Sequence, residues 1–77
     1  MKHPRTAANL LHDLALELVE MTRGAKQDAL ASGSDYDRGR HFALYEAISL
    51  LSQQTVAFGL TLKDIGLDGL DIDQELL

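Results

Sequence analysis

A long helical pattern from Tyr36 to Leu60 constrains this chain more than any other feature of its sequence. Residues 36–60 read YDRGRHFALYEAISLLSQQTVAFGL, and their apolar residues recur three and four positions apart, the spacing that keeps side chains on one face of a helix. Ser34 and the acids after it are typical of a helix start, and Gly59 is typical of a helix end. We therefore predict a helix over about residues 35–58 and an all-α fold built around it.

A second amphipathic pattern precedes this helix and predicts another one over about residues 5–31. Its predicted core stripe consists of apolar residues at helical spacing, with two further residues beside them: Ala7, Leu11, Leu14, Leu18, Met21, Ala25 and Ala29, flanked by Ala15 and Thr22. The short loop 32–34 would fold the two helices into an antiparallel hairpin, in which residues whose numbers add up to about 68 lie level. Asp28 would then pair with Arg40.

Small residues of the second helix suggest how the hairpin closes. Gly39, Ala43 and Ala47 are spaced four apart and should face the first helix, together with Leu51 and Phe58 further out. The hairpin is therefore expected to be narrow at the loop and wide at its open end.

The C-terminal part predicts a short third helix and an acidic tail. Thr61 to Asp64 read as a capping-like start for a helix over about residues 62–65, and the tail covers residues 66–77. The tail keeps several apolar residues, too many for a fully solvated segment, so we expect it to cover the open end of the hairpin. The whole chain, residues 1–77, is predicted to be a single domain.

Apolar residues outside the hairpin faces form a surplus. The residues concerned are Phe42, Tyr45 and Val56 on the second helix and Leu16, Val19 and Leu30 on the first. Because one partner helix cannot cover both sides of another, these six positions are our candidate interface, and we predict a homodimer that forms a four-helix bundle. The alternative is that the C-terminal tail covers one of these patches within the monomer.

Composition narrows the function classes. A domain of 77 residues without cysteine lacks disulfides and thiolate metal sites, so oligomerisation is the stabilising device left to it. A net charge of −5 opposes nucleic-acid binding, which normally uses clustered Lys and Arg. There is no apolar run long enough to span a membrane and no secretion signal, so we expect a cytoplasmic protein.

Candidate chemical groups are few. Asp37 and His41 stand one turn apart, which allows a metal or acid–base site, but a solvated Asp–His pair on a helix edge explains them as well. The same two interpretations apply to His12 with its neighbouring acids. No serine lies in a nucleophile motif. We therefore predict no catalytic residues, no cofactor and no metal, and leave a chemical role for Asp37 and His41 open.

The segment from Gly39 to Leu60, with G-R-H-F-A-L-Y-E-A-I-S, Gln54 and F-G-L, resembles small uncharacterised bacterial all-helical proteins. That resemblance implies no activity. The leading hypothesis is a non-enzymatic protein that acts through homodimerisation or another protein partner. The first alternative is a transcription-linked regulator that binds DNA through the C-terminal segment, although the acids there would face phosphates. The second is a metal-dependent helical enzyme.

Overall fold

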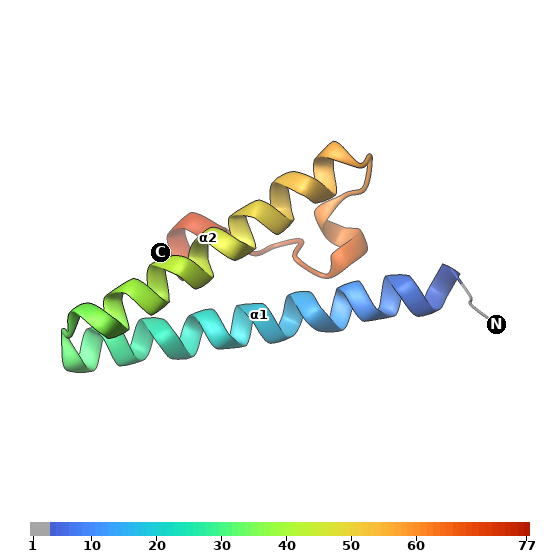
Figure 1. The fold of residues 1–77 in the computed structure, drawn as a ribbon. Coiled ribbons are helices and arrows are strands. Elements are labelled where there is room, and N and C mark those ends of the chain that lie inside the picture. Colours follow the sequence, from blue (N-terminus) through green and yellow to red (C-terminus); the bar gives the residue numbers. More distant parts are fainter. Residues whose placement is uncertain (1–3) are drawn as a thin grey trace.

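The protein folds as a helical hairpin whose open end is filled by its C-terminal residues. The computed structural model describes residues 4–77, with side chains from residue 6 onward. Helix α1 (Pro4–Ser32) and helix α2 (Asp35–Ala57) run antiparallel and diverge away from the loop, and the chain then returns through η1 (Leu62–Ile65) and α3 (Ile72–Leu76) (Figure 1). Within the described residues the fold is all-helical. The hairpin is narrow at the loop and wide at its open end, as predicted.

Local signals in the sequence set the helix ends. The Ser34 hydroxyl accepts a hydrogen bond from the Asp37 amide and so caps α2. Gly59, just beyond α2, has φ 78°, a left-handed conformation that glycine adopts without a Cβ clash. At η1, Thr61 and Asp64 form a reciprocal capping box. Each predicted long helix lies within one residue of the observed one at both ends.

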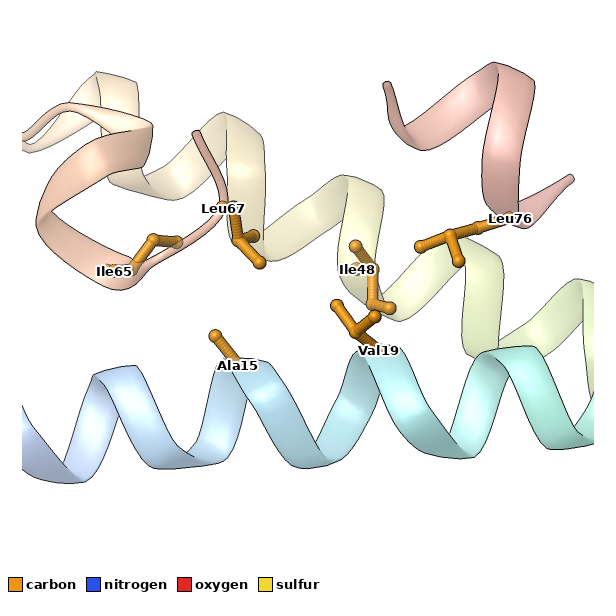
Figure 2. Packing of buried hydrophobic residues seen from close by; sticks show 6 residues of the cluster. All are labelled: Ala15, Val19, Ile48, Ile65, Leu67 and Leu76. Carbon is orange, nitrogen blue, oxygen red and sulfur yellow. The ribbon is translucent and has the colours of Figure 1, made fainter. Parts of the chain in front are cut away.

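The core lies where both long helices meet the C-terminal residues. Its buried apolar side chains come from every part of the fold: Ala15 and Val19 on α1, Ile48 on α2, Ile65 on η1, Leu67 beyond it, and Leu76 on α3. Figure 2 shows Leu76, Ile48 and Val19 gathered between the helices. Full burial of a side chain of this kind contributes about 1.5–3 kcal/mol. The expectation that the tail covers the open end of the hairpin is therefore confirmed.

The predicted core stripe of the first helix is partly wrong. Leu11, Leu14 and Met21 are exposed by 37%, 48% and 46%, whereas Val19, which we had placed outside the stripe, is buried. The cause is the C-terminal segment, residues 60–77. Because it packs beside the seam of the hairpin, the buried side of α1 is turned towards Ala15 and Val19.

The predicted small-residue contact is wrong for the same reason. Gly39, Ala43 and Ala47 are exposed, and α2 buries Ile48 and Thr55 instead. The predicted register is nevertheless confirmed by the ion pair between Asp28 Oδ2 and Arg40 Nη1, which are 3.6 Å apart.

Candidate interaction surfaces

Polar side chains from both long helices contact residues 73–77, which we call the C-terminal turn, and hold this turn in place. Arg23 Nη2 lies 3.6 Å from Glu75 Oε1, and Lys26 Nζ donates a hydrogen bond of 3.2 Å to the Glu75 carbonyl. From α2, His41 Nε2 lies 2.5 Å from the Leu76 carbonyl oxygen and donates to it when protonated there. Because the buried Leu76 side chain lies between these contacts, this side of the hairpin is occupied by the chain itself.

Tyr45 is also tied to the C-terminal segment. Its hydroxyl donates a hydrogen bond of 2.5 Å to Asp73 Oδ1. The Asp73 carboxylate raises the pKa of the Tyr45 phenol, because ionisation would remove this hydrogen bond and bring two negative charges together. Half of the aromatic pair predicted as surplus is thus engaged within the monomer.

Gly66 marks a close approach between the C-terminal segment and α1. It has φ 75°, and a Cβ built at this position would collide with the imidazole ring of His12. Any side chain here would meet a conformational penalty, and the exposed His12 ring would have to move aside. His12, considered above as a chemical group, packs against this turn.

The six predicted interface residues do not form one patch. Val19 is buried in the core and is removed from the candidate surface, and Tyr45 is half-buried. Phe42 is 52% exposed and stacks beside Tyr45 with ring centroids 6.1 Å apart. The C-terminal turn is bonded to Arg23 on α1 and to Tyr45 on α2, so it lies between the members of the set on the two helices. The remaining exposed members are Val56, Leu16 and Leu30.

A larger, mostly apolar surface with little charge lies on the opposite side of the hairpin. We call it the open face. Helical periodicity places Leu14 and Met21 on the side of α1 opposite Arg23. It likewise places Ala43 and Ala47 on the side of α2 opposite Tyr45, whereas Leu11 lies at the edge of the face. All ten positions are exposed: Ala7, Leu10, Leu11, Leu14 and Met21 on α1, and Ala43, Ala47, Leu50, Gln54 and Phe58 on α2.

The open face carries little charge, and the ion pair of Asp28 and Arg40 lies at its end near the loop, because Asp28 continues the seven-residue row of Leu14 and Met21. Charged residues make up 25% of the sequence, but on this surface the charged side chains Asp28 and Arg40 lie near the loop, and the ten positions beyond them include only one polar residue, Gln54. Where the helices diverge, the surface continues into an apolar groove that includes Leu11, Phe58 and Ile65. Depletion of charge is the property that distinguishes the centre of a protein–protein interface from ordinary surface.

Sequence reasoning missed the open face because it assigned these residues to the interior of the hairpin. A signal was present in the sequence. Both helices carry a wide uncharged sector, wider than one antiparallel neighbour covers. The position of the C-terminal segment decided which part of each sector stayed exposed, and no local pattern reports that position.

The groups considered for chemistry have structural partners. Asp37 Oδ2 accepts a hydrogen bond of 2.5 Å from the Ser32 hydroxyl at the loop, while His41 contacts the C-terminal turn, so the two side chains are engaged in different places. Among residues 4–77, no three His, Asp or Glu side chains are grouped as metal ligands. In the same range, no helix has the length and apolarity needed to cross a membrane.

No protein-family model, curated protein or solved structure matches the chain significantly. Functional inference therefore depends on the surfaces described above.

Proposed function

We propose that this protein is non-enzymatic and acts through protein–protein contact, with self-association into a four-helix bundle as its principal form. The observation that supports the proposal is the open face, a mostly apolar surface on two long helices that the chain leaves uncovered. Monomeric proteins seldom expose a contiguous apolar patch of more than a few hundred Å² unless it binds something.

The shape of the monomer supports the same proposal. Its radius of gyration is 13.8 Å, whereas a compact domain of this length is expected to have about 11.5 Å. Its shortest dimension is 17 Å, and a helix with its side chains is about 10–12 Å across. The hairpin is therefore a thin slab, and a second layer would make it a compact bundle.

The alternative functions gain less support. The C-terminal segment, which the DNA-binding alternative would use, contains only the four-residue η1 and the five-residue α3, and the carboxylates of Asp73 and Glu75 are engaged by Tyr45 and Arg23. The metal-enzyme alternative relied on Asp37 and His41, and their present hydrogen bonds offer no shared site. Protein–protein contact is the function that the exposed surface favours.

Association can be tested by multi-angle light scattering of the full chain from low micromolar to several hundred micromolar concentration. We expect the mass to rise from 8.5 kDa to about twice that value. A chain that remains monomeric at the highest concentration would contradict the proposal.

A matched pair of leucines on α1 identifies the surface used. Leu14 on the open face and Leu16 on the other side are exposed by 48% and 46%, so a charge at either position costs the monomer about the same. We expect Leu14→Glu to abolish the dimer and Leu16→Glu to preserve it. The reverse result would return the interface to the set predicted from sequence.

A further inference from the structure

We infer that a second copy of this chain covers the open face in one specific arrangement, with α1 of each copy lying over α2 of the other and both loops at the same end. The inference rests on the proposed self-association and specifies how the two copies pack. Three properties of the open face support it: its area, the distribution of large and small side chains over it, and the position of one ion pair.

The area fits a second copy. Six large side chains of the open face, Leu10, Leu11, Leu14, Met21, Leu50 and Phe58, are exposed by 37% to 78%. Together they present roughly 600 Å² of apolar surface, taking about 180 Å² for a fully exposed side chain of this size. A standard interface buries about 800 Å² per partner, of which about 65% is apolar in homodimers. The open face thus supplies what one half of a stable dimer requires.

The two helices contribute side chains of different size. Near the middle of the hairpin, α1 presents Met21 and α2 presents Ala47 at the same height, and towards the open end Leu14 is level with Gln54. A two-fold axis parallel to the hairpin would lay α1 of one copy over α2 of the other, so that Met21 fills the space above the small side chain at position 47 of the second copy. A two-fold axis that crosses the hairpin at right angles, in the plane of the interface, would instead stack α1 on α1 and α2 on α2, so that Leu14 and Met21 would meet the same large residues of the other α1.

The ion pair between Asp28 and Arg40 favours the same axis. These residues lie level within each hairpin, so positions whose numbers add up to about 68 are at equal height. When the loops are at the same end, Asp28 of each copy comes level with the partner's Arg40, and the four charges alternate in sign. When the loops are at opposite ends, each pair lies over the apolar part of the other copy. Charge complementarity therefore selects the arrangement with α1 over α2.

The same register identifies a contact between the two copies that can be tested. Met21 comes level with the partner's Ala47, near the middle of the interface, and both positions are exposed in the monomer. Because the chain contains no cysteine, each introduced cysteine is the only thiol in its chain. A chain with Met21→Cys can thus be mixed with a chain carrying Ala47→Cys and oxidised gently. The mixed disulfide dimer is identified by mass spectrometry.

We expect this pair to crosslink at least tenfold faster than a control pair, Glu20→Cys with Ala47→Cys, in which Glu20 lies on the side of α1 away from the open face. A second pair, Leu14→Cys with Met21→Cys, reports the alternative arrangement, in which α1 lies antiparallel on α1. Faster crosslinking of this second pair would overturn the inference but leave self-association intact.

Light scattering on the reduced variants separates the remaining outcomes. Reduced chains that are dimeric but crosslink no faster than the control would place the interface elsewhere and overturn the inference. Wild-type chains that stay monomeric would remove the proposed function itself. Circular dichroism on each variant shows that the exposed substitutions leave the helices unchanged.

Discussion

The two sides of the hairpin differ in what completes them. On one side, α1 and α2 are covered by residues 60–77, which contribute Ile65, Leu67 and Leu76 to the core and are held by hydrogen bonds and an ion pair at the C-terminal turn. On the open face, comparable apolar side chains lie exposed, and the charged pair of Asp28 and Arg40 is confined to the end near the loop. Apolar residues on the same helix can therefore have different roles. Those under the C-terminal segment stabilise the monomer, and those on the open face are available for a partner.

The largest expected effect on stability separates two leucines. Leu76 is fully buried, and Leu76→Ala should lower the free energy of unfolding by about 2–5 kcal/mol. Leu14 is 48% exposed, and Leu14→Ala should cost less than about 1 kcal/mol in the monomer. Urea unfolding at low micromolar concentration, followed by circular dichroism, measures both. Equal losses would mean that the two sides do not differ as described.

The loss in free energy of unfolding caused by each of these two substitutions can also be measured at several protein concentrations. If the open face is covered by another copy, the cost of Leu14→Ala should grow as protein concentration rises, because it then includes lost dimer stability. The cost of Leu76→Ala should change less, since Leu76 is buried within each chain.

An intermediate effect is expected at two glycines of the C-terminal segment. Gly66 and Gly69 have φ of 75° and 79°, so alanine at either position should cost about 1–2 kcal/mol for the left-handed backbone. Only at Gly66 would the added Cβ also collide with His12, while nothing lies within 4 Å at Gly69. Gly66→Ala should therefore cost more than Gly69→Ala in urea unfolding, by the small amount needed to move the exposed His12 ring aside.

Removal of the His12 ring provides the control. In a His12→Ala background, the cost of Gly66→Ala should fall to that of Gly69→Ala, because the steric part has been removed and only the backbone part remains. An unchanged cost would show that the exposed His12 ring adds no steric penalty at Gly66.

The smallest expected effect concerns the surface hydrogen bond between Tyr45 and Asp73. Its contribution to stability should be complete below the ordinary phenol pKa of about 10 and should be lost as the pH rises through the raised pKa of folded Tyr45. Ultraviolet titration in a Tyr36→Phe background observes Tyr45 alone, because the chain has two tyrosines. Asp73→Asn should lower the titration midpoint. A midpoint insensitive to this change would show that the hydrogen bond is not formed in solution.

Much of the fold could be predicted from sequence because helix ends are encoded locally. Ser34, Gly59 and the Thr61–Asp64 pair act on backbone groups within a few residues, so the bounds of both long helices and of η1 were predicted to within about a residue. The short loop also sets the register, and the pairing of Asp28 with Arg40 follows from it. Helix α3 was predicted only as tail, since its five residues carry no periodic pattern long enough to recognise.

The candidate surface was predicted less well. Phe42, Val56, Leu16 and Leu30 are exposed as expected, but Val19 and Tyr45 are engaged within the monomer, and the open face was assigned to the hairpin interior. Helical periodicity shows which residues share a side of a helix, but it does not show which side another segment will cover. That choice depends on contacts between residues far apart in the sequence, such as Leu76 with the core around Val19.

The sequence by itself thus determined an all-helical hairpin, its register and the presence of more apolar surface than two helices can bury between them. Only the tertiary structure decided how that surface is divided. The C-terminal segment covers only one side of the hairpin. It covers the side on which Leu76 is buried beside Arg23, Lys26 and His41. The physical reason is that burial depends on the joint placement of all elements, whereas helix formation and capping depend on neighbours along the chain.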